Sequence, residues 1–266
     1  FTSLHNKSLA MIFQKTSTRT RVSFEVAMTQ LGGHAQYLDW RTTNFTLGDI
    51  SDEIKCISRY VDIIMARVYK HRDVAIMAKS SSVPVINGLS DLEHPCQILG
   101  DLLTIKERFG NFMGVKVAYV GDGNNVCNSL IIGCAKLGIP ISVSTPLNYQ
   151  PDKFALLIGR KLKKLFLTDN PYKAVKGANV VYTDTWVSMG DEAEKEKRLK
   201  AFLPYQVNKR LMKAASHPCF MHCLPVHRGC EVTSDVLDSK ESIVYDQAEN
   251  RLPIQKAIIL TLLQEI

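Results

Sequence analysis

The chain alternates short β-rich runs with stretches of helical spacing, and this alternation limits the possible folds more than any other feature. Helices are expected over residues 19–31, 97–109, 125–137 and 172–176. Strands are expected at "SLAMIF", "HAQYLD", "DIIMARV", "VPVIN", "VKVAYVG", "PISVST", "KLFLTD", "NVVYTD", "CFMHCLP" and "SIVYD". Apolar strands separated by helices are typical of parallel sheets with helices on both faces.

Ten candidate strands in 266 residues are many for a single sheet, and the length itself favours two domains. A boundary is expected at "FGNFMG", between a long helix and a fresh strand, which divides the chain into residues 1–112 and 113–249. The predicted fold class is α/β, with two doubly wound domains that are each a parallel sheet flanked by helices.

Unusual polar residues follow the predicted strands. They include Ser17 to Arg21 after the first strand, Arg67 at the end of the third, and the segments "GLSDLEHPCQ", "DGNN", "TWVSMG" and "QAENR" farther along. Ligands of open α/β sheets bind outside the carboxyl ends of the strands. This placement predicts an active site in the cleft between the two domains.

Composition excludes several classes of protein. Hydrophobic residues make up 45% and charged residues 22% of the chain, as in ordinary soluble proteins, and no apolar run is long enough to span a membrane. The net charge of +7 is scattered rather than gathered in a nucleic-acid-binding module, so it fits an enzyme for anionic small molecules. Seven cysteines without a C-x-x-C pair favour a reducing compartment. Because the sequence begins at Phe1 without a methionine, an upstream segment is expected.

The stretch "STRTR" stands where the first strand gives way to a helix. Free backbone N–H groups at a helix start favour an anion, and phosphate above all. Ser17, Thr18 and Thr20 add hydroxyl groups, and Arg19 adds a planar fork that matches phosphate oxygens. Helix capping explains one hydroxyl but not three beside two arginines, so the stretch predicts a phosphate site.

The segment "GDGNNV" after "VKVAYV" invites comparison with dinucleotide-binding loops. The fingerprint requires a third glycine where this chain has Val126, and no acidic residue closes the strand near "ISVST" to hold a ribose. A nicotinamide cofactor is therefore disfavoured. The loop instead offers Asn124 and Asn125 to a small substrate.

Histidines and cysteines cluster in "HPCFMHCLPVHRGC". Zinc is the alternative, but structural zinc sites pair two cysteines with a second, cleanly spaced ligand pair. If "CFMHCLP" is a strand, Cys219 and Cys223 share one face and His222 points to the other. We therefore expect Cys223 beside a substrate rather than on a metal. In "HPCQ", His94 and Gln97 can face a common ligand from the first turn of a helix.

Taken in order, "STRTR", "MARV", "HPCQ", "GDGNN", "DTWVSMG", "HCLP" and "AENR" resemble the motifs of the aspartate/ornithine carbamoyltransferase family. The similarity covers essentially the whole chain, and "SMG" with "HCLP" is similar to the ornithine-specific branch. The resemblance implies transfer of the carbamoyl group from carbamoyl phosphate to L-ornithine, giving L-citrulline and phosphate without a metal or a cofactor. It implies a carbamoyl-phosphate-binding domain over 1–112, onto which a helix over 250–266 packs back, and an ornithine-binding domain over 113–249.

The resemblance also implies roles for single residues. The catalytic residues would be Arg67, His94, Asp184 and Cys223. Carbamoyl phosphate would be held by Ser17, Thr18, Arg19, Thr20, Arg67, His94, Gln97 and Arg251. Ornithine would be held by Asn125, Asp184, Ser188, Met189, Cys223 and Leu224.

The family also implies a homotrimer or a larger assembly of trimers, acting in the cytoplasm or, in a eukaryote, in the mitochondrial matrix. Where many members carry a Gln or His that reaches a neighbouring subunit, this chain has Thr46. Two alternatives remain open: a carbamoyltransferase for putrescine, aspartate or an acylated ornithine, and a ligand-binding paralogue without turnover. Asp184 and Ser188 argue against the first, since they would lack an α-amino group to bind.

Overall fold

The computed structural model describes residues 3–187 and 192–264. The chain divides into two compact units, Phe1–Leu99 with Glu249–Ile266 (unit 1) and Gly100–Ala248 (unit 2). The division falls inside helix α4 (Pro95–Phe109), whereas the expected boundary after residue 112 lies beyond the end of this helix. The reason is that Cys96, in the first turn of α4, packs in the core of unit 1, while Asp101 is hydrogen-bonded to residues of unit 2.

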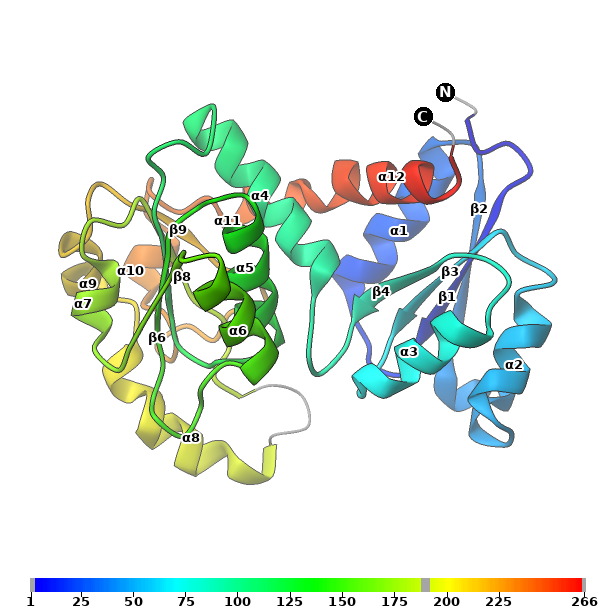
Figure 1. Cartoon of the computed structure of the whole chain (residues 1–266), viewed down its shortest axis with the longest axis horizontal. Helices are drawn as coiled ribbons and strands as arrows, with labels where there is room; N and C mark the ends of the chain where they lie inside the picture. The colour runs from blue at the N-terminus through cyan, green and yellow to red at the C-terminus, as the bar shows by residue number, and fades with distance from the viewer. Residues whose placement is uncertain (1–2, 188–191, 265–266) are drawn as a thin grey trace. The chain divides into compact units, whose positions relative to one another are not determined.

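Unit 1 is built on a four-stranded parallel sheet of order β2-β1-β3-β4, with helices on both faces (Figure 1). Along β1, Leu9 and Met11 face the core under α1 and α12, while Ala10 and Ile12 face the core under α2 and α3. This period of two is the reason that a fully buried strand separates two apolar layers. The elements are β1 (Ser8–Phe13), α1 (Thr18–Gln30), β2 (His34–Asp39), η1 (Trp40–Thr42), η2 (Asn44–Thr46), α2 (Ile50–Ile57), β3 (Ile63–Arg67), α3 (His71–Ser80), β4 (Val85–Leu89) and α12 (Arg251–Leu262).

Unit 2 is built on a five-stranded parallel sheet of order β7-β6-β5-β8-β9. One core layer joins Ala118 of β5, Val181 of β8 and Phe220 of β9 to helices α7, α9, α10 and α11. The elements are β5 (Val117–Val120), α5 (Asn125–Lys136), β6 (Ile141–Ser144), α6 (Lys153–Lys161), β7 (Leu165–Thr168), α7 (Pro171–Val175), β8 (Val180–Tyr182), η3 (Glu192–Glu194), α8 (Lys195–Phe202), η4 (Leu203–Tyr205), α9 (Lys209–Lys213), β9 (Cys219–Met221), α10 (Ser234–Leu237) and α11 (Val244–Glu249).

The predicted class, two α/β domains with parallel sheets flanked by helices, is confirmed. Within the described residues, none of the helices has both the length and the apolar character that crossing a membrane requires.

Two strand predictions were wrong. "SIVYD" is not a strand, because Val244 starts α11 and buries its side chain together with that of Gln247, at a helical spacing of three. "CFMHCLP" is a strand only as far as Met221. Beyond that point the His222 N–H is bonded to the Gln247 side chain, and Leu224 takes a φ of 61°, outside the extended region. "VPVIN" is displaced as well, since β4 runs on to Leu89.

Candidate active site

The start of α1 has the geometry of an anion site. Ser17 is the N-cap in an extended conformation, and its Oγ accepts the Thr20 N–H at 3.3 Å. The same hydroxyl donates to Thr20 Oγ1 at 3.2 Å, and Thr20 is buried. Thr18 and Arg19 are the first two helical residues, so their backbone N–H groups belong to the first turn, which lacks intrahelical acceptors. The predicted helix start is therefore present, with one of its hydroxyls used as the cap.

Positive charge is concentrated around His94, which is 6% exposed. Burial, and after it the charges of Arg251, Arg67, Lys15 and Arg19, lower the pKa of His94 well below its usual 6.5. His94 is thus a neutral imidazole at neutral pH, surrounded by cations of unit 1.

The arginines of this cluster come from separate elements. Arg67 is the last residue of β3, and Arg251 is the first residue of α12. Arg251 Nη1 donates to Gln97 Oε1 at 2.6 Å, which joins α12 to the first turn of α4. Both arginines are buried, at 7% and 3% exposure, so their charges act in a medium of low dielectric constant. We call the residues Ser17 to Thr20, Arg67, His94, Gln97 and Arg251 the anion cradle.

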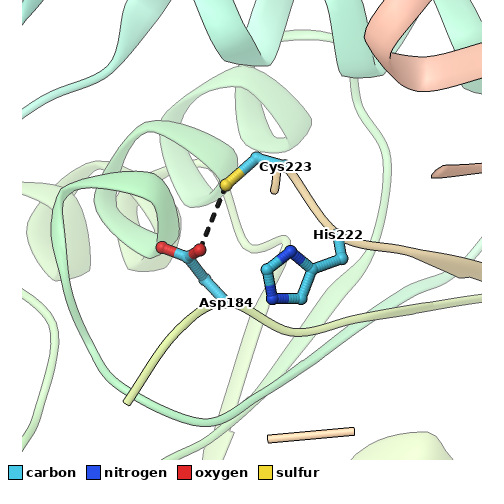
Figure 2. A group of neighbouring side chains, drawn as sticks. All are labelled: Asp184, His222 and Cys223. Atoms are coloured by element: carbon cyan, nitrogen blue, oxygen red, sulfur yellow. Dashed lines mark hydrogen bonds between the residues drawn. The ribbon is translucent and has the colours of Figure 1, made fainter. Parts of the chain in front are cut away.

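A second group lies at the carboxyl ends of β8 and β9 in unit 2. The Cys223 thiol donates to Asp184 Oδ1 at 3.1 Å (Figure 2). The other oxygen of Asp184, Oδ2, accepts from Asn124 Nδ2 at 2.7 Å. Asp184 is 5% exposed, and Cys223 is half-buried. A buried carboxylate beside an accessible thiol can bind a cationic amine.

Asn124 was singled out as a loop residue, but its structural role was missed. Its Oδ1 accepts the N–H groups of Val126 and Cys127 and so caps α5, while its Nδ2 orients Asp184. Asn125, the residue predicted to bind ornithine, is the first residue of α5. The same loop requires a glycine at position 123, because a Cβ there would collide with the backbone of Pro151.

His222 was expected to point away from Cys223, and this prediction was wrong. Figure 2 shows its ring beside Asp184, because the chain has left the strand before this residue. The Leu224 N–H donates to His222 Nδ1 at 2.8 Å, so the proton of a neutral ring is on Nε2. That nitrogen lies 3.3 Å from Glu231 Oε1. Burial acts to raise the pKa of Glu231, but the His222 ring and the His227 backbone N–H outweigh it, and the pKa is lowered.

The residues that could hold a zinc ion in the structure differ from those that the sequence suggested. Ligand atoms of Asp184, His222 and Cys223 lie within 4.8 Å of one another, as a metal site requires. The sequence pointed instead to Cys219, which is buried, and burial raises the pKa of its thiol to about 11. The His222 ring is already engaged by Leu224 and Glu231, so a metal would have to displace a contact of the chain.

The structure therefore brings the predicted residues together in two groups, one in each unit. In unit 1 the charges of Arg19, Arg67 and Arg251 act on His94, and Arg251 is bonded to Gln97. Lys15 belongs to the same charged group and was missed, although it precedes the "STRTR" stretch. Asp184 and Cys223 form the second group, and Leu224 follows directly with its N–H on His222. Ser188 and Met189 lie outside the described residues.

Comparison with known proteins matches the chain to two family models. Residues 1–107 match the carbamoyl-phosphate-binding domain of aspartate/ornithine carbamoyltransferases, and residues 113–262 match the Asp/Orn-binding domain. The chain is 57% identical over 267 residues to an ornithine carbamoyltransferase of Pyrococcus horikoshii, covering 98% of this chain and 84% of that protein.

Solved structures agree. The ornithine carbamoyltransferase of Pyrococcus furiosus has a TM-score of 0.94 at 55% identity, covering 99% of this chain and 87% of that one. The anabolic enzyme of Campylobacter jejuni has a TM-score of 0.93 at 40% identity, covering 98% and 89%. The chain belongs to the aspartate/ornithine carbamoyltransferase family.

Proposed function

We propose that this chain is a carbamoyltransferase that moves the carbamoyl group of carbamoyl phosphate to the side-chain amine of L-ornithine, giving L-citrulline and phosphate. The observation that carries the proposal is the neutral, buried His94 surrounded by Arg19, Arg67 and Arg251 next to the start of α1. A dianion is the ligand that this charge distribution favours.

Carbamoyl phosphate binds in the anion cradle. Its phosphate accepts from the first N–H groups of α1, from the hydroxyls of Ser17, Thr18 and Thr20, and from the guanidinium of Arg19. Arg67 and His94 donate to the carbamoyl oxygen, where negative charge develops when the tetrahedral intermediate forms. A neutral His94 donates through one ring nitrogen, and Gln97 binds the carbamoyl amide while Arg251 holds its side chain in place.

Ornithine binds to the second group. Asp184 pairs with the α-ammonium, and Cys223 and the backbone of Leu224 lie along the side chain toward the reacting amine. Asn125 and Met189 hold the α-carboxylate, and Ser188 adds a contact to the α-amino group. N-acetylornithine has an uncharged α-nitrogen, so it leaves the buried carboxylate of Asp184 without a cation to pair with. Putrescine keeps an ammonium at this position but lacks the α-carboxylate that Asn125 would bind.

The reaction needs the side-chain amine in its neutral form, although such an amine has a pKa of about 10.4 in water. Transfer from water into the field of Arg19 and Arg67 favours loss of its proton. The amine nitrogen then bonds to the carbamoyl carbon, and the bond from that carbon to the bridging phosphate oxygen breaks. The nitrogen gives up its second proton to the leaving phosphate, which departs as the dianion HPO₄²⁻. The arginines stabilise both the oxyanion and the leaving group.

The proposal is tested by presenting carbamoyl phosphate with a panel of amines. Citrulline should form with L-ornithine, and product formation with putrescine, aspartate or N-acetylornithine should be slower by at least about a hundredfold. Faster turnover of another amine would replace ornithine as the substrate. Absence of turnover with every amine, together with tight binding of carbamoyl phosphate, would identify a non-catalytic paralogue. A cytoplasmic homotrimer remains the proposed state of the protein.

A further inference from the structure

Three buried polar side chains of unit 2 form a hydrogen-bonded network of their own. Gln247 Nε2 donates to Asp101 Oδ1 at 2.7 Å and to the Tyr182 hydroxyl oxygen at 2.9 Å, and the Tyr182 hydroxyl donates to Asp101 Oδ2 at 3.0 Å. All three residues have 0% exposure. The network joins α11, α4 and β8, and nothing in the proposed reaction uses it.

The network fixes which way the Gln247 amide points. A carboxylate only accepts hydrogen bonds, so the amide nitrogen must face Asp101, and the amide oxygen must then face the other way. On that side Gln247 Oε1 accepts the backbone N–H of His222 at 2.9 Å. A reversed amide would place two acceptors together at Asp101 and two donors together at His222, which in a buried site is costly.

The hydrogen bond between Gln247 and the His222 N–H lies directly after the end of β9. Tyr182 and Met221 are the last paired residues of β8 and β9, so His222 is the first residue after the strand. Cys223 follows His222 directly, and Asp184 follows Tyr182 by two residues. The network thus holds both strand ends, whose side chains meet where Cys223 Sγ donates to Asp184 Oδ1 at 3.1 Å.

We infer that Gln247 is a positioning residue, which through the His222 N–H sets the Cys223 thiol against the Asp184 carboxylate, with Asp101 and Tyr182 fixing the orientation of its amide. The inference deepens the proposed function, because these two side chains are the proposed ornithine contacts. It assigns no contact between Gln247 and a substrate.

The test uses Gln247→Met in the full chain, which keeps the length of the side chain and removes both polar atoms. The first measurement is the alkylation rate of Cys223 by iodoacetamide, followed by mass spectrometry of its peptide. A thiol that donates to a carboxylate is kept protonated, and the thiolate is the reactive form. Releasing the strand end should raise the rate about fivefold, the population change expected for losing one ordinary hydrogen bond.

The second measurement separates the two substrates. In Gln247→Met, kcat/KM for ornithine should fall by about tenfold, because the side chains that bind ornithine lose a residue that orients them. The Kd for carbamoyl phosphate should stay unchanged. If the unaltered chain transfers no carbamoyl group to ornithine, the proposed function fails. The alkylation rates still decide whether Gln247 positions the Cys223 thiol.

Val244→Ala is the matched control, since Val244 is buried on the same helix, in the apolar core of unit 2, and its side chain has no hydrogen-bonding atom. It should lower the unfolding midpoint without changing Cys223 alkylation. Tyr182→Phe is the milder variant, which removes one acceptor of the Gln247 amide and should give a smaller rise of about twofold. Alkylation in Gln247→Met and Tyr182→Phe that stays at the rate of Val244→Ala would overturn the inference.

Discussion

Protonation of His94 should destabilise the protein, and the effect can be worked out from its surroundings. Its pKa in the folded state lies well below 6.5, because of burial and then of Arg251, Arg67, Lys15 and Arg19. In the unfolded chain the pKa returns to about 6.5. Between these two values the unfolded state binds more protons than the folded state. The free energy of unfolding is therefore not reduced by His94 above pH 6.5, and it falls as the pH decreases below that value. The slope approaches about 1.4 kcal/mol per pH unit for one such group.

The assay is urea-induced unfolding measured from pH 7.5 to pH 5 on the unaltered chain and on His94→Gln. The variant cannot take up this proton, so its stability should fall less steeply, by up to about 1.4 kcal/mol per pH unit below pH 6.5. The lowered pKa of Glu231 also costs stability in acid, but equally in both proteins, so the difference reports His94. His34→Gln, at an exposed position, is the control and should keep the full slope.

Anion binding gives the same residue a second signature. A bound dianion offsets the nearby arginines, so inorganic phosphate should raise the pKa of His94, observed through its Cε1 proton by NMR. Identical stability profiles for the unaltered chain and His94→Gln, or a His94 signal that titrates near 6.5 and ignores phosphate, would refute the charge distribution described for the cradle.

Three further predictions follow from the two groups. Arg19→Ala removes a charge-assisted contact and should weaken carbamoyl phosphate binding by about 2 kcal/mol, roughly thirtyfold in Kd by calorimetry; an unchanged Kd would contradict the cradle. Asp184→Asn should lower kcat/KM for ornithine and narrow its advantage over N-acetylornithine, whose α-nitrogen is uncharged, because the amide keeps the shape and loses the charge; full activity and selectivity would count against the assignment. Cys223→Ser should reduce turnover while leaving carbamoyl phosphate affinity nearly intact, and chelators should change neither protein, so stoichiometric zinc on the active enzyme would overturn the account of this thiol.

The sequence predicted the parts of the site that depend on strand ends. "STRTR" and Asp184 follow apolar strands, Arg67 ends one, and the carboxyl ends of parallel strands lie at one edge of their sheet. The sheets themselves were predictable for a different reason: buried parallel strands are continuous apolar runs in the sequence.

The parts that were missed depend on contacts between residues far apart in the chain. Gln247 bonds to His222 and to Asp101, and neither contact leaves a periodic pattern. "SIVYD" was taken for a strand because five residues are too few to separate a period of two from one of 3.6. The orientation of His222 was wrong because alternation was continued past Met221, where side-chain contacts replace the strand ladder.

A labelled single turnover follows the carbon that the enzyme transfers from carbamoyl phosphate to the side-chain nitrogen of ornithine. The enzyme in excess is mixed with ¹³C-carbamoyl phosphate and L-ornithine, and the products are followed by NMR. The label should appear in the ureido carbon of citrulline, one equivalent for each phosphate released. Phosphate released with the label in bicarbonate or cyanate, or label retained in carbamoyl phosphate, would contradict this transfer.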